Sequence, residues 1–300
     1  MKNYLPFGDI LKESARVFRL HFTKILILIL LVMLPLSIVN GIVGEIMLRD
    51  SGLTAFMELM NDENATEEMI ETGLADLIPG IMPSLLLMTL LSLLALAFPA
   101  ALTRLTLDEC RHGALTLNYM QGDLYVVVTD ANEVHDVGSA ADYFGASVKL
   151  MPKIIFCTLC GGLITMAGLS LMFFPGLIAF AVMSVSLYYT VLTGRTGFKG
   201  FLETGILLLK RPFILLVFIV GNGAALFTNF MINNLFLLIP LPEATAGTVL
   251  SVALTAASTC ISSVVTAFTA IMTTCLTVES LDKRGFKANE KGFLTAGSEQ

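Results

Sequence analysis

The sequence predicts an all-α integral membrane protein with six transmembrane helices arranged as three hairpins. Of its 300 residues, 55% are hydrophobic and only 14% are charged, and the mean hydropathy is +0.81. Soluble domains carry about 25% charged residues, so this chain lacks the polar groups needed to cover a water-facing surface. Several apolar stretches also reach the roughly 17–25 residues that cross a hydrocarbon core. We therefore expect one polytopic membrane domain over residues 1–280 and a polar cytoplasmic tail over 281–300.

Six apolar segments are long enough to be spans. The first, 25–48, follows a charged, helix-patterned segment and is too long for the 7–15-residue core of a signal peptide. Pro175-Gly176 is a turn pair that predicts a tight hairpin between the third and fourth spans. The sixth, at about 1.5 Å per residue, would run roughly 50 Å, so it should tilt or extend beyond the bilayer. The predicted spans are 25–48, 81–103, 154–174, 177–194, 213–239 and 246–278.

The basic residues predict the orientation of these spans. Lys and Arg gather in the cytoplasmic segments of membrane proteins. With the six spans above, all of the 18 Lys and Arg residues except Arg49 fall on one side. We therefore expect a multi-pass protein of the plasma (inner) membrane with both termini in the cytoplasm.

Two loops are long enough to carry structure of their own. The outer loop, 50–77, is acidic and has the pattern of two short amphipathic helices. It would bind a cation or a basic partner, or it is simply a solvated loop without basic residues, which is the interpretation we favour. The cytoplasmic loop, 108–153, contains the β-type run 124–129, which predicts a short strand or hairpin.

Each pair of spans is preceded by a basic segment with helical periodicity. These leaders cover the N-terminal segment, about 140–153, and 198–211. Helices with basic polar faces lie in the membrane interface, where anionic headgroups attract them. The expected architecture is therefore three copies of a cytoplasmic interfacial amphipathic helix followed by a hairpin. Anionic lipids are the expected partners, beside a candidate membrane-protein partner, and the residues expected at the inner headgroups are Lys12, Arg16, Arg19, Lys24, Lys149, Lys153, Lys199, Lys210 and Arg211.

The sequence contains no recognisable catalytic constellation. His21, His112 and His135 lie outside the predicted spans and far apart in sequence. His112 follows Asp108, Glu109 and Cys110, but that spacing is not a regular ligand set, so a solvated loop end is favoured over a metal site. We expect no catalytic, cofactor or metal site, and the absence of a block of like charges argues against nucleic acid as a partner.

Uncharged polar residues are frequent in the fifth and sixth predicted spans. Such residues let helices approach closely and hydrogen-bond across their interface, at roughly 0.6–2 kcal/mol for each bond. Alternatively, the two spans enclose a polar cavity for a lipid headgroup or a small solute. The packing interpretation is favoured, because Ser and Thr also bond the carbonyls of their own helix. The candidates for the cavity are Asn222, Asn229, Asn233, Ser258 and Ser262.

Three stretches carry a family resemblance: 7–18 before the first span, 173–178 at the start of the fourth, and 197–212 before the fifth. With them the chain resembles the bacterial six-span membrane proteins of the DUF975/YciC type, which are related to the membrane domain of some glycerophosphodiester phosphodiesterases. The resemblance implies a bacterial plasma-membrane location. Thr204 stands where that family typically has serine, and no phosphodiesterase catalytic domain accompanies the spans.

The function expected from these observations is that of a non-catalytic membrane protein. It would organise or assist a membrane or lipid-related process through lipid or partner contacts. The first alternative is a transporter or channel that uses a polar cavity between spans five and six, and the second is an intramembrane lipid enzyme built from scattered residues.

Overall fold

The structure is a computed structural model, and almost all of the residues that it describes are helical. The described residues are 7–50, 52–62, 66–119, 138–171, 173–210, 216, 223–224, 227–228, 230–232, 245–282, 286–288 and 294–296. The predicted strand at 124–129 and most of the predicted fifth span, 213–239, lie outside them.

Five helical segments among the described residues are long and apolar enough to cross a membrane. The chain is therefore a membrane protein, because so many long helices with exposed apolar side chains would be unfavourable in water. Each segment overlaps one predicted span, namely the first, second, third, fourth or sixth. The segments are Phe22–Met47, Glu67–Cys110, Ala140–Leu171, Phe174–Thr193 and Val249–Asp282.

The described chain divides into two compact units, of which the first comprises residues 1–29, 96–229 and 263–300. Its elements are α1 (Phe7–Leu20), α2 (Phe22–Leu28), α6 (Ala97–Tyr119), α7 (Ala140–Leu171), α8 (Phe173–Thr193), α9 (Gly197–Leu209), the second part of α11 (Thr245–Asp282), and the strands β1 (Phe286–Ala288) and β2 (Leu294–Ala296).

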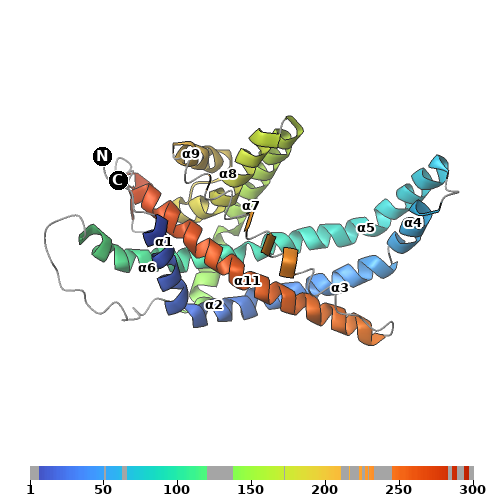
Figure 1. The fold of residues 1–300 in the computed structure, drawn as a ribbon, viewed down its shortest axis with the longest axis horizontal. Helices are drawn as coiled ribbons and strands as arrows, with labels where there is room; N and C mark the ends of the chain where they lie inside the picture. Colours follow the sequence, from blue (N-terminus) through green and yellow to red (C-terminus); the bar gives the residue numbers. More distant parts are fainter. Residues whose placement is uncertain are drawn as a thin grey trace. The chain divides into compact units, whose positions relative to one another are not determined.

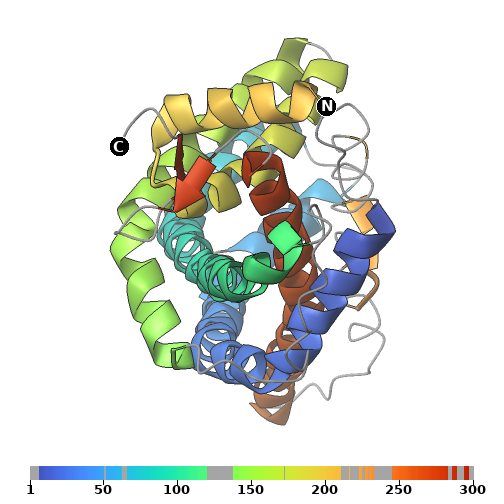
Figure 2. The same cartoon turned by 90° about the vertical axis from the view of Figure 1, so that its left-hand side faces the viewer.

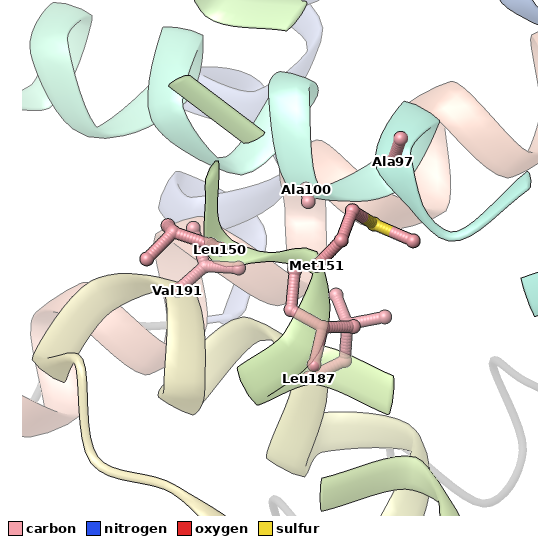
Figure 3. Packing of buried hydrophobic residues seen from close by; sticks show 7 residues of the cluster. Ala97, Ala100, Leu150, Met151, Leu187 and Val191 are labelled. Atoms are coloured by element: carbon pink, nitrogen blue, oxygen red, sulfur yellow. The ribbon is translucent and has the colours of Figure 1, made fainter. Parts of the chain in front are cut away.

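Within this unit α6 lies in the interior, with α7 on one side and α11 on the other (Figure 2). Ala97 and Ala100 begin α6 and are buried because their small side chains let neighbouring helices approach. Figure 3 shows them packed against Leu150 and Met151 of α7 and Leu187 of α8. This cluster fixes α6, α7 and α8 against one another.

The helices α7 and α8 form the most extensive contact of the unit and run side by side (Figure 1). α7 ends at Leu171 and α8 begins at Phe173, so the connection is as tight as Pro175-Gly176 predicts, although both of these residues lie inside α8. Two glycines permit the close approach. A Cβ on Gly168 would lie 3.0 Å from the Cα of Gly176, and any larger side chain would push the helices apart.

A turn and a hairpin complete the first unit. Gly194 follows α8 with φ of 71°, and its N–H bonds the Thr190 carbonyl at 2.8 Å, which is the left-handed conformation that glycine supplies at helix ends. β1 and β2 pair antiparallel, and Leu294 packs into a cluster with Leu107 of α6 and Leu207 of α9. The segment expected to be only a polar tail therefore contributes to the packed interior.

The second unit comprises residues 30–95 and 230–262. It contains most of a π-helical turn, η1 (Ile29–Met33), together with α3 (Leu34–Asp50), α4 (Leu53–Met60), α5 (Glu67–Ala95) and the first part of α11. A Cβ on Gly41 of α3 would lie 3.4 Å from Val252 of α11, so this glycine also marks a close helix contact. Gly73 of α5 lies against Phe56 and Leu59 of α4.

Three expected boundaries were wrong. The outer loop was expected to hold two short helices, but only α4 is separate, and the second is the start of α5, which continues through Pro79 and Pro83. The leader at 140–153 is likewise not a separate helix, since α7 continues through Pro152. The loop expected from residue 108 is helical as far as Tyr119, where α6 ends. The first two errors have the same physical origin, because proline removes one hydrogen bond but neighbouring helices can still hold the chain helical.

Candidate functional site

The outer surface of α9 combines apolar and basic side chains in one row. Phe198, Leu202, Ile206 and Leu209 are 56%, 47%, 50% and 60% exposed, and they recur at the three- and four-residue spacing of one helix face. Lys199 and Lys210 are exposed at its two ends. We call this set of six residues the α9 face.

The opposite side of α9 is packed. Phe201, Leu207 and Leu208 are buried, as are Gly200 and Thr204. α9 contacts α7 and α8 through this side. One side of α9 is therefore packed against the protein, while about half of the surface of each side chain in its apolar row is exposed.

Hydrogen bonds to Glu203 of α9 connect this helix to α8 and to the segment between the two helices. Arg195 Nη1 donates to Glu203 Oε1 at 2.5 Å, and Tyr189 Oη donates to Glu203 Oε2 at 2.8 Å. Partial burial raises the pKa of Glu203, but the hydrogen bonds from Arg195 and Tyr189 outweigh it, so the pKa lies below its ordinary value. The Arg195 guanidinium also lies 6.0 Å from the ring centroid of Phe286 in β1. Sequence reasoning had found none of these pairings.

α1 presents a second surface of mixed character. Leu11 is 40% exposed, and Lys12 and Arg19 are exposed on the same helix, while Phe22, the first residue of α2, is 45% exposed. The side chain of Lys12 is 83% exposed and lies 3.7 Å from Asp9. α1 therefore carries the same combination of side chains as the α9 face.

The other predicted headgroup residues are distributed unevenly. Lys149 is exposed on α7. Lys24 donates to the Gly138 carbonyl at 3.2 Å, and Lys153 donates to the Gly194 carbonyl at 3.4 Å, so both are partly committed to the protein. Arg211 lies outside the described residues.

Arg16 is 32% exposed and pairs with two carboxylates of the first unit. Its Nη2 lies 2.6 Å from Glu13 Oε1, and its Nη1 lies 3.1 Å from Glu109 Oε1. The hydrogen bond to Glu13, opposed by partial burial and aided by both negative charges, raises the pKa of Arg16 above its ordinary value. Glu109 Oε2 in turn lies 3.0 Å from His21 Nε2. We call these four residues the Glu109 cluster.

The Glu109 cluster is a buried polar network without the form of a catalytic site. The side chains of His21 and Glu109 are 1% and 5% exposed, and His21 Nδ1 has no hydrogen-bond partner among the described residues. No group of three or more His, Cys, Asp and Glu residues in the described part of the chain is placed to hold a metal ion. The prediction of a solvated loop end at Glu109 and Cys110 was wrong, because both are buried in α6.

A small polar pocket lies within the second unit, between α3, α5 and α11. Its volume is about 100 Å³. The Oδ1 atom of Asn40 is buried and accepts no hydrogen bond from the described residues. The pocket contains no charged side chain, and it is lined by Met33, Leu36, Ser37, Asn40, Leu91, Ser92, Ala95, Thr255 and Thr259.

The residues predicted for a polar cavity are not the ones that line this pocket. Asn222, Asn229 and Asn233 lie outside the described residues. Ser258 is buried, and it and Ser262 belong to the stripe of α11 next to the one that carries Thr255 and Thr259. The pocket also uses the first and second predicted spans. Asn40 and Ser37, two polar residues inside the predicted first span, were signals for it in the sequence.

No family model, curated protein or solved structure matches this chain in comparisons with known proteins.

Proposed function

We propose that this chain is a non-catalytic, multi-pass protein of the bacterial inner membrane that organises or assists a membrane process by binding anionic lipid headgroups on the cytoplasmic side. The α9 face is the observation that carries the proposal. Its exposed row of apolar residues is flanked by a lysine at each end, while its other side is packed against the protein.

The dimensions of α9 favour a position in the membrane interface. Its 13 residues extend about 20 Å, which is too short for the roughly 30 Å of a hydrocarbon core. A helix lying flat at the headgroups buries its apolar row in the acyl boundary and leaves its lysines at the phosphates. Each lysine near an anionic surface contributes about 1 kcal/mol. The mixed surface of α1 would add to this attraction.

The orientation and the wider architecture belong to the same proposal. The positive-inside pattern places both termini in the cytoplasm, and the resemblance to six-span bacterial proteins supports the inner membrane. Five described spans, with the sixth expected over 213–239, are compatible with three hairpins. α1 and α9 would then be the leaders of the first and third hairpins.

Lipid-dependent stability tests the proposal. The purified protein in neutral detergent should unfold at a higher temperature when phosphatidylglycerol is added than when phosphatidylcholine is added. Lys199→Gln combined with Lys210→Gln should weaken the apparent phosphatidylglycerol affinity roughly 30-fold, since it removes about 2 kcal/mol. The matched control, arginine at both positions, should retain the affinity. Equal effects of the two lipids, or no change in the glutamine variant, would refute the proposal.

Reconstitution into liposomes distinguishes the alternatives. Saturable movement of a solute or of labelled lipid would replace the proposal with a transporter or channel. Turnover of labelled phospholipid by the purified protein would instead establish an intramembrane lipid enzyme.

A further inference from the structure

Three hydroxyl groups in the lining of the pocket of the second unit donate to carbonyls of their own helices. Ser37 Oγ donates to the Leu34 carbonyl at 2.9 Å, and Ser92 Oγ donates to the Met88 carbonyl at 2.9 Å. Thr259 Oγ1 donates to the Thr255 carbonyl at 2.8 Å. Each of these hydroxyl protons is therefore used within its own helix.

Asn40 adds the strongest acceptor. Its Oδ1 is buried and receives no hydrogen bond from the described residues, which is unfavourable at membrane depth until a donor reaches it. An occupant of the pocket should therefore carry a hydrogen-bond donor. The lining contains no charged side chain, so neither a phosphate or carboxylate nor a cation would find an opposite charge there.

The position of the pocket indicates where its occupant comes from. The lining residues of η1, α3 and α5 lie near the middle of the predicted spans 25–48 and 81–103. Ser92 and Thr255 are exposed, and Leu90 and Leu94 beside Ser92 are 50% and 52% exposed. In a membrane-spanning helix such a surface faces acyl chains. Access is thus from the lipid, through an opening with a polar edge and an apolar surround.

The size of the pocket sets the size of the group that it holds. Its volume of about 100 Å³ corresponds to roughly three water molecules at their share of liquid volume. That space holds a hydroxylated head of a few heavy atoms. The π-helical turn η1 ends at Met33 in the pocket wall, and such turns inside helices occur frequently at functional sites.

From these observations we propose that the pocket binds the hydroxyl head of a neutral, unphosphorylated membrane alcohol, such as a long-chain alcohol or a diacylglycerol. The hydroxyl donates to Asn40 Oδ1 and the apolar chain leaves between Ser92 and Thr255 into the lipid. This site is independent of the α9 face, since it lies in the other unit and recognises an uncharged group.

Photolabelling of the full-length protein in phosphatidylcholine nanodiscs tests the proposal. A hexadecanol that carries a diazirine in its chain should label peptides of α3, α5 or α11 in a saturable manner. Unlabelled hexadecanol should compete, whereas its O-methyl ether should not, because the ether has no hydroxyl proton. Asn40→Leu should raise the half-saturation concentration roughly 3- to 10-fold, because the variant loses one neutral hydrogen bond to the alcohol. Thr89→Val is the matched control, because Thr89 is an exposed hydroxyl on α5 outside the lining and should leave labelling unchanged.

Several outcomes would overturn the proposal. Unchanged labelling of a folded Asn40→Leu variant would exclude the amide as the recognising group, and equal competition by the ether would show an apolar patch without donor recognition. Competition by glycerol but not by hexadecanol would assign the pocket to a soluble polyol instead. If Asn40→Leu fails to fold, Asn40→Ala replaces it, with the same expected loss of affinity.

Discussion

Removing the Glu109 carboxylate is the most informative perturbation of the first unit. Glu109 joins α6 to the N-terminal segment through Arg16 at 3.1 Å and His21 at 3.0 Å. Glu109→Gln keeps the shape of the side chain but abolishes its charge. The variant therefore isolates the electrostatic part of the contact.

The expected loss follows from the burial of each partner. Arg16 is 32% exposed and keeps Glu13, so the cost at that end is small. His21 is 1% exposed and has no other partner among the described residues, so its imidazole is left poorly satisfied. Breaking one side of a buried charged pair costs about 3–5 kcal/mol, and the partial exposure of Arg16 places our expectation near the lower end, at about 3 kcal/mol.

Unfolding of the detergent-solubilised protein by a denaturing detergent measures this loss. Glu13→Gln is the matched control, because Glu13 also pairs with Arg16 but is 33% exposed, and it should cost less than about 1 kcal/mol. Glu109→Leu combined with His21→Leu should cost less than the sum of the two single variants, since no unpaired polar group remains. A Glu109→Gln variant as stable as Glu13→Gln would refute the reasoning.

Two further predictions concern the contacts that position α9 and α8. Glu203→Gln should destabilise the protein by about 1 kcal/mol at neutral pH, given the 24% exposure of that side chain. The pKa of Glu203 is lowered in the folded state. The stability difference between Glu203→Gln and the wild type should therefore be largest above the ordinary glutamate pKa and should vanish as the pH falls through the lower pKa of the folded state. A stability difference that grows on acidification would contradict this prediction. Gly168→Ala should cost about 1–3 kcal/mol, because its Cβ would meet the Gly176 backbone at 3.0 Å. Gly162→Ala in the same helix meets nothing within 4 Å and should gain up to about 1 kcal/mol, so equal unfolding midpoints for the two alanine variants would be the contrary result.

The sequence was sufficient for the membrane assignment, because hydropathy depends on composition within a window and needs no knowledge of tertiary contacts. Helix ends were harder. Pro79, Pro83 and Pro152 all lie inside helices, so a local breaker signal did not predict the boundary. The mean hydropathy of a window of residues thus predicts the presence of a helix more reliably than the residues at which that helix begins and ends.

Polar contacts between residues far apart in the chain could not be predicted from the sequence pattern. The sequence gives the charge of Arg16 but not its second partner, Glu109, which is 93 positions away. α11 carries hydroxyls on several faces, so composition alone did not distinguish Thr255 and Thr259, which line the pocket, from Ser258 and Ser262. Asn40 was overlooked because one amide in a long apolar run hardly changes the mean hydropathy.

The packing of Leu294 has a consequence for the synthesis of this protein. Leu294 of β2 completes a cluster whose first member in the chain is Leu107 of α6. At about 5–20 residues per second, roughly 10–40 s separate the translation of these two leucines. Throughout that interval the apolar surface that Leu294 covers has no native partner, so the packing of the first unit cannot be completed before Leu294 has been translated. The synthesis of this strand, rather than the insertion of any one helix, therefore sets the earliest moment at which folding of the first unit can end.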